Sequence, residues 1–158
     1  MKKRIESQIE EREIQVVEYL KEKWSCKIEY TGRNLFSKVD GFIFKHNQLK
    51  GICAIQCRRQ SLSWMRDYKS VIISYPKLTL GADLSRLLGV KYFVMIYTCD
   101  NQIIQFEITD KKGNIVCPMY IKPSILPKST NFEEKVIHNA YLNMEDQTYC
   151  KIYNRGYD

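Results

Sequence analysis

The chain has 158 residues, a length typical of a single domain with one hydrophobic core. Hydrophobic residues make up 44% of it and charged residues 27%, which excludes an intrinsically disordered chain and a mostly apolar membrane protein. The formal net charge is +7, and it comes almost entirely from residues 41–80, which hold seven Lys and Arg against one Asp. The sequence therefore predicts one cationic surface, of a kind that suits phosphate groups, rather than a protein that is basic throughout.

The N-terminal third predicts a helix followed by a β-hairpin. Residues 5–24 place apolar side chains at steps of three and four, as an amphipathic helix does. Glu13 interrupts this stripe on the core side, so it either reaches solvent at the flank of the helix or belongs to a site between the helix and its neighbour. Residues 38–45 and 49–58 alternate like two strands, joined by a turn at His46-Asn47.

Two helices and two strands are expected next. Ser61 is predicted to cap a helix that carries Met65 and continues to Ile72. A second helix should begin at Pro76 and end at Gly89. Its predicted buried face consists of leucines, namely Leu80, Leu84, Leu87 and Leu88. Strands are expected at residues 90–99 and 102–108.

These elements predict an α/β fold, with a central mixed sheet flanked by helices. We expect one domain over residues 1–158, with a core at about residues 9–110 and an irregular C-terminal extension at about residues 111–158. A short helix is predicted within this extension, at residues 132–138.

Cysteine and histidine usage argues against a zinc site. The two histidines are far apart in the sequence, and only Cys53 and Cys57 are closely spaced, so no zinc-binding pattern occurs. The six cysteines are expected to be free thiols in a reducing compartment. Because the basic residues 1–4 are not followed by an apolar stretch, we expect a cytoplasmic protein.

The segment richest in chemical information is Asp40-Gly41-Phe42, the predicted hairpin, and the run from Gly51 to Arg58. It resembles the PD-(D/E)xK nuclease superfamily, which has the restriction-endonuclease-like fold, and in particular its small phage-type members. In those, Asp-Gly-Phe is followed after the hairpin by G-x-x-E-x-K-C-R. The likeness extends over about residues 9–110, but Ala54 stands at the position of the Glu and Gln56 at that of the Lys.

The resemblance implies a hydrolase that cleaves phosphodiester bonds in DNA with Mg²⁺ or Mn²⁺. Its metal ligands would be Asp40, the residue at position 54 and, from the first helix, Glu13, while Gln56 would take the place of the catalytic Lys. An alanine cannot ligate a metal ion, and a glutamine cannot supply the positive charge of a lysine. We therefore expect a phage-derived nuclease, acting in the host cell, that is inactive in this chain.

Two explanations of Ala54 stay open, an engineered Glu→Ala exchange and a natural loss of the ligand. Under the second, the chain would be a catalytically dead nucleic-acid-binding or anti-defence protein on the same fold. Arg58, Arg59 and Lys77 are the residues predicted to bind nucleic acid. DNA is the expected partner, and a homodimer is an alternative that the sequence leaves open.

Overall fold

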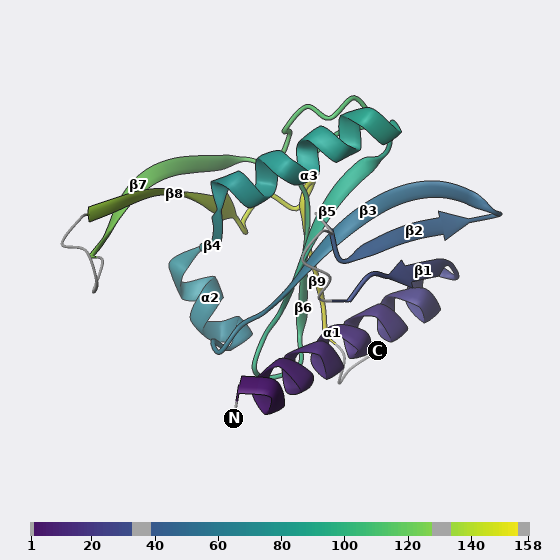
Figure 1. The fold of residues 1–158 in the computed structure, drawn as a ribbon, viewed down its shortest axis with the longest axis horizontal. Helices are drawn as coiled ribbons and strands as arrows, with labels where there is room; N and C mark the ends of the chain where they lie inside the picture. Colours follow the sequence, from purple (N-terminus) through teal and green to yellow (C-terminus); the bar gives the residue numbers. More distant parts are fainter. Residues whose placement is uncertain (1, 33–38, 128–133, 155–158) are drawn as a thin grey trace.

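Two β-sheets and three helices make up the protein, in a computed structural model that describes residues 2–32, 39–127 and 134–154 (Figure 1). The helices are α1 (Lys2–Trp24), α2 (Leu62–Tyr68) and α3 (Tyr75–Leu88). The strands are β1 (Lys27–Tyr30), β2 (Gly41–Lys45), β3 (Gln48–Cys57), β4 (Ser70–Ser74), β5 (Lys91–Tyr97), β6 (Ile103–Glu107), β7 (Met119–Pro127), β8 (Glu134–Asn143) and β9 (Cys150–Tyr153). The predicted α/β class is thus confirmed.

A six-stranded mixed sheet forms the centre of the fold, in the order β1-β2-β3-β5-β6-β9. Its strands are antiparallel except for β3 and β5, which are parallel neighbours. A smaller antiparallel sheet has the order β4-β8-β7, and its β7–β8 hairpin extends away from the central sheet, past α2 (Figure 1). No helix among the described residues has the length and apolar character needed to cross a lipid bilayer.

The two faces of the central sheet bury two separate hydrophobic clusters. Helix α1 covers one face, where Val16, Val17 and Leu20 pack with Cys53 and Ile55 of β3. Helices α2 and α3 and the smaller sheet contribute to the cluster on the opposite face, to which Ile52 and Ala54 of β3 belong. The alternation expected for this strand is therefore present, and it separates neighbouring residues of the motif.

The predicted hairpin between β2 and β3 is confirmed. His46 and Asn47 form its two-residue turn, both with positive φ, at 53° and 61°, and Lys45 pairs with Gln48. Such a turn matches the right-handed twist of the strands that it joins. The hairpin places Asp40 directly before β2 and brings Gly41 opposite Cys53 of β3.

The structure differs from the predictions for the two later helices. Helix α2 ends at Tyr68, because Lys69 adopts the left-handed conformation, and Ile72 lies in strand β4. Helix α3 has the expected bounds but a different buried face, which consists of Leu78, Gly81, Ala82 and Ser85, while Leu80, Leu87 and Leu88 are exposed and Leu84 is half-buried. The reason is close packing, since a Cβ atom at Gly81 would overlap the Tyr92 ring of β5.

The C-terminal part also differs from the expected irregular extension. It contains β7 and β8, which pair with each other, and β9, which completes the central sheet beside β6. The helix expected at residues 132–138 is wrong for its described part, since β8 begins at Glu134, and residues 132–133 lie outside the described residues. The sequence of a strand does not show which strands it pairs with. Strand β8 pairs with β4 on one side and with β7 on the other.

Candidate functional site

Asp40 lies where β2 begins and is held by the neighbouring strand. Its backbone N–H donates to the carbonyl oxygen of Cys53 over 2.9 Å, and its Oδ2 accepts a hydrogen bond of 2.6 Å from the backbone N–H of Ile55. Burial raises the pKa of Cys53 and of Tyr92, and the negative charge of Asp40 raises both further. These two residues belong to different core clusters, so Asp40 lies close to both.

Glu13 and Tyr30 form the second acidic feature of the site. Glu13 is only 4% exposed on α1, and the Tyr30 hydroxyl donates to its Oε2 over 2.5 Å. Burial and this hydrogen bond raise the pKa of Tyr30, and the charges of Glu13, Glu10 and Asp40 contribute. Of the two alternatives for Glu13, solvent at the helix flank is therefore wrong, because the side chain is buried against Tyr30 of β1, and its role in a site stays a prediction.

Ala54 and Gln56 lie in β3 on the face opposite α1. Ala54 is fully buried in the hydrophobic cluster of that face and offers no polar atom. The Gln56 side-chain oxygen accepts a hydrogen bond of 2.7 Å from Arg58 Nη2. The structure thus brings Glu13 and Asp40 to Tyr30, whereas Ala54 and Gln56 face the opposite cluster.

The residues present do not fit the divalent ion that the resemblance implies. Tyr30 and the backbone of Ile55 donate hydrogen bonds to the carboxylates of Glu13 and Asp40, and position 54 supplies no ligand. Among the described residues, no three or more His, Cys, Asp or Glu side chains are grouped so that they could hold a metal ion. Mg²⁺ is held by oxygen ligands with strict geometry, so no hydrolytic step can be derived from these residues.

Arg58 is the most unusual charge of the site. Its Nη2 also donates to the backbone oxygen of Ile72 over 2.7 Å, but its Nε is buried without a hydrogen-bond partner. Within residues 2–32, 39–127 and 134–154, no carboxylate forms an ion pair with it. Burial lowers the pKa of Arg58, although a guanidinium remains charged at neutral pH. The side chain is therefore a half-buried cation with unused donor capacity.

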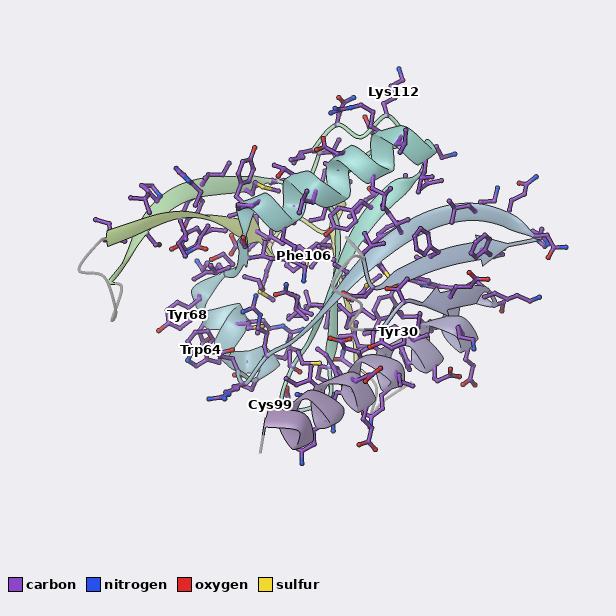
Figure 2. All side chains as sticks on the ribbon, viewed as in Figure 1. Tyr30, Trp64, Tyr68, Cys99, Phe106 and Lys112 are labelled. Atoms are coloured by element: carbon purple, nitrogen blue, oxygen red, sulfur yellow. The ribbon has the colours of Figure 1, made fainter. Side chains whose placement is uncertain are left out.

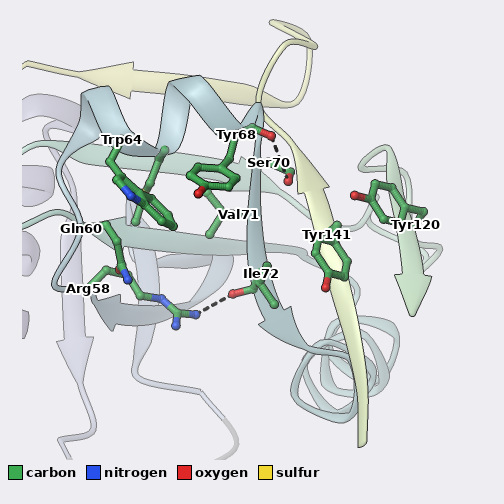
Figure 3. A pocket seen from close by; sticks show the side chains of 10 residues that line it. Arg58, Gln60, Trp64, Tyr68, Ser70, Val71, Ile72, Tyr120 and Tyr141 are labelled. Atoms are coloured by element: carbon green, nitrogen blue, oxygen red, sulfur yellow. Dashed lines mark hydrogen bonds between the residues drawn. The ribbon is translucent and has the colours of Figure 1, made fainter. Parts of the chain in front are cut away.

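A cleft of about 310 Å³ opens beside this guanidinium. It is lined by Arg58, Gln60, Trp64, Met65, Tyr68, Ser70, Val71, Ile72, Tyr120 and Tyr141. Figure 3 shows Arg58 reaching toward Ile72, with Trp64 and Tyr68 on one side of the cleft and Tyr120 and Tyr141 on the other. The sequence analysis missed these four aromatic residues. For Trp64 and Tyr68 the sequence holds a local signal, because they are four residues apart on a predicted helix that follows Arg58 and Arg59.

Arg59 and Lys77, the other predicted binding residues, do not line this cleft. Arg59 is exposed directly after Arg58. Lys77 is half-buried in the first turn of α3, and neither a hydrogen bond nor an ion pair links it to another described side chain. Of the three cations predicted to bind nucleic acid, Arg58 is the one that lines this cleft.

Comparisons of the chain with models of known protein families, with curated proteins and with solved structures find no match.

Proposed function

We propose that this chain binds nucleic acid, with a backbone phosphate held at Arg58, and does not hydrolyse it. The observation that carries the proposal is the half-buried guanidinium without a carboxylate partner among the described residues, at the edge of an open cleft. A desolvated cation is costly unless an anion accompanies it. A phosphate matches a guanidinium because its oxygens can accept two parallel hydrogen bonds from the N–H groups.

The charge distribution supports the same proposal. Six of the seven cations of residues 41–80 are not in an ion pair with a described carboxylate, the exception being Lys69, whose Nζ lies 3.8 Å from Glu145. Arg58 and Lys69 line the cleft and an adjoining cavity, whereas Lys45 and Lys50 line cavities elsewhere. Cations attract a polyanion, and this attraction weakens as the salt concentration rises. We therefore propose DNA as the partner. From the resemblance of the motif, we also propose a restriction-endonuclease-like core as the fold and the cytoplasm of a phage host as the place of action. The six free thiols agree with a reducing compartment.

The first test compares Arg58→Gln with Arg86→Gln. Both exchanges remove one positive charge, but Arg86 is exposed on α3 and lies 3.8 Å from Asp83. Fluorescence anisotropy with labelled 20-mer oligonucleotides, single- and double-stranded, measures the dissociation constant from 50 to 200 mM NaCl. Loss of one phosphate contact should weaken binding about tenfold and reduce the slope of log K against log salt by about one.

The control should bind within about twofold of the unmodified chain, because a remote exposed charge is largely screened. Arg58→Lys should fall between the two, since it keeps the charge and loses the planar pair of donors. Equal affinities and slopes for Arg58→Gln and Arg86→Gln would contradict the proposal, as would the absence of binding to any oligonucleotide at 50 mM NaCl.

A second proposal, metal-dependent DNA hydrolysis, applies to a form of this chain with a carboxylate at position 54. The observation that favours it is the approach of Asp40 and Glu13, from different elements, to Tyr30. Asp40 directly precedes Gly41, the partner of Cys53 in β3, so a carboxylate restored at Ala54 would lie next to Asp40, whereas Glu13 belongs to α1 on the opposite face of β3.

A further inference from the structure

Three of the four aromatic side chains of the cleft are more exposed than aromatic residues of a folded protein usually are. Trp64 is 46% exposed, Tyr68 63% and Tyr120 51%, while Tyr141 is half-buried. Large aromatic side chains normally contribute to a core or to an interface. Their exposure in one cleft marks a binding surface, whose occupant the charges and shape can identify.

The rings form two pairs that face the same cleft. Trp64 and Tyr68 of α2 have ring centroids 4.2 Å apart, with 35° between the planes. Tyr120 of β7 and Tyr141 of β8 are stacked, with centroids 4.7 Å apart and planes at 4°. The pairs come from distant parts of the sequence, and the end of α2 and the smaller sheet bring them together (Figure 3).

Cations lie at both ring pairs. Arg58 borders the first cleft, and Lys122 Nζ is 5.2 Å from the centroid of Tyr120 and 5.6 Å from that of Tyr141. Because Lys122 Nζ lies over the faces of these rings, it places a positive charge beside the surface that a ligand would contact. The combination of aromatic rings with flanking cations is complementary to a flat, uncharged ring that is carried on an anionic backbone.

The cleft continues into a second cavity. This cavity, of about 420 Å³, shares four wall residues with the first, which are Tyr68, Ser70, Tyr120 and Tyr141. The two cavities thus adjoin each other along these residues, and we call them together the aromatic groove. A groove of two joined cavities suits a chain of several units better than a single small molecule.

We infer that the aromatic groove binds unpaired bases of single-stranded nucleic acid, which stack on Trp64, Tyr68 and Tyr120 while Arg58 holds a phosphate. The inference rests on the proposed function, because it assigns to the same site the form of nucleic acid that it accepts. Bases of a duplex are already stacked and paired, so their faces are not available to aromatic side chains. A symmetric contact between two copies of this groove would instead place Arg58 and Lys122 of both copies against each other.

The experiment separates bases from phosphates. Anisotropy at 50 mM NaCl compares a 12-mer single strand of mixed sequence with a 12-mer of the same backbone that lacks the bases, and with the matching duplex. The normal strand should bind at least about tenfold more tightly than the abasic strand, because the abasic strand has no bases to stack on the rings. Trp64→Leu with Tyr68→Ala should reduce this difference to the part that Tyr120 contributes, whereas Leu87→Ala, which truncates another exposed apolar side chain, should leave it unchanged.

Tryptophan fluorescence reports the stacking directly. The chain has two tryptophans, and Trp24 lies on α1, away from the groove. Quenching by the normal strand should persist in Trp24→Phe and disappear in Trp64→Phe. The abasic strand should quench neither variant, although it should still bind and remain sensitive to Arg58→Gln.

The outcomes distinguish the inference from the proposed function. Binding that depends on Arg58 but is equal for normal, abasic and duplex DNA, without quenching of Trp64, would overturn the inference and leave the proposed function standing. Absence of all binding would overturn both. A concentration-dependent dimer in which Trp64 becomes buried, or a peptide that buries Trp64 and that no oligonucleotide displaces, would assign the groove to a protein partner and overturn the inference.

Discussion

At the scale of single residues, the site has the cation Arg58 but no carboxylate at position 54. Arg58 is held by Gln56 and by the backbone of Ile72, so its guanidinium is oriented before any ligand binds. Such preorganisation reduces the entropy that binding would otherwise cost. Ala54, two residues from Gln56 on the same strand, is sealed in the core. Position 54 is therefore the residue at which binding and hydrolysis can be separated.

Restoring the motif tests the second proposal at this residue. Ala54→Glu combined with Gln56→Lys should produce cleavage of duplex, branched or single-stranded DNA in the presence of Mg²⁺ or Mn²⁺, which a gel assay detects. The cleavage should vanish when Asp40→Ala is added. The ion should also raise the melting temperature of the restored chain, because it offsets the repulsion between carboxylates at a buried position.

Ala54→Gln with Gln56→Lys is the matched control, since it has nearly the same shape and no negative charge. It should neither cleave DNA nor gain stability from the ion. Should the restored chain remain inactive on all three substrates while folding normally, the hydrolytic proposal would fail. The binding proposal would be unaffected, because it depends on Arg58.

At the scale of elements, the position of the groove depends on α2 and its anchoring. Ser61 accepts a hydrogen bond of 3.1 Å from the backbone N–H of Trp64 and so caps the helix. Asp100, in the turn after β5, accepts one of 3.1 Å from Leu62 N–H and one of 2.6 Å from Thr98 Oγ1. A helix of seven residues has little stability of its own, so these contacts hold its aromatic side chains in place.

A pH dependence follows from Asp100. The hydrogen bond from Thr98 lowers the pKa of its carboxyl group, and the Leu62 N–H contributes. A carboxyl group with a lowered pKa stabilises the folded state above its unfolded pKa and loses this effect as pH falls below about 4. Asp100→Asn should therefore be less stable at pH 7 and lose less stability between pH 7 and pH 2.5, as measured by thermal unfolding. Asp67→Asn, at an exposed position on α2, should retain the full pH dependence, and equal pH profiles for all three chains would contradict the assignment.

Elements with a local signal could be predicted from the sequence, and elements defined by their neighbours could not. Helix α1 and the turn at His46-Asn47 follow from periodicity and turn chemistry within a few residues. The buried face of α3 was predicted wrongly because it packs closely on the Tyr92 ring of β5. Only a small residue such as Gly81 fits against this ring, and the ring lies in another element. The aromatic groove was missed for the same reason, since Tyr141 joins Trp64 only through the pairing of β4 with β8.

At the scale of the whole molecule, the last strand meets the C-terminal half of the first helix. Trp24 of α1 donates through Nε1 to the Tyr153 hydroxyl of β9 over 3.3 Å, and that hydroxyl donates to Gln105 Oε1 over 2.9 Å. The ring of Tyr153 also contacts Tyr19 edge-on, with centroids 6.2 Å apart. Strand β9 thus connects the first helix with β6 at one edge of the central sheet, and it belongs to the core rather than to an extension.

Tyr153 should therefore stabilise the protein as one cooperative unit. Tyr153→Ala removes the ring contacts and both hydrogen bonds, and it should lower the free energy of unfolding by about 2 kcal/mol or more. Tyr153→Phe keeps the ring and should cost about 1 kcal/mol. Urea unfolding followed by tryptophan fluorescence and by far-UV circular dichroism should give coincident midpoints for every variant, because Trp24 and the sheet unfold together. If Tyr153→Ala shifts neither midpoint, β9 is dispensable and the central sheet is complete without it.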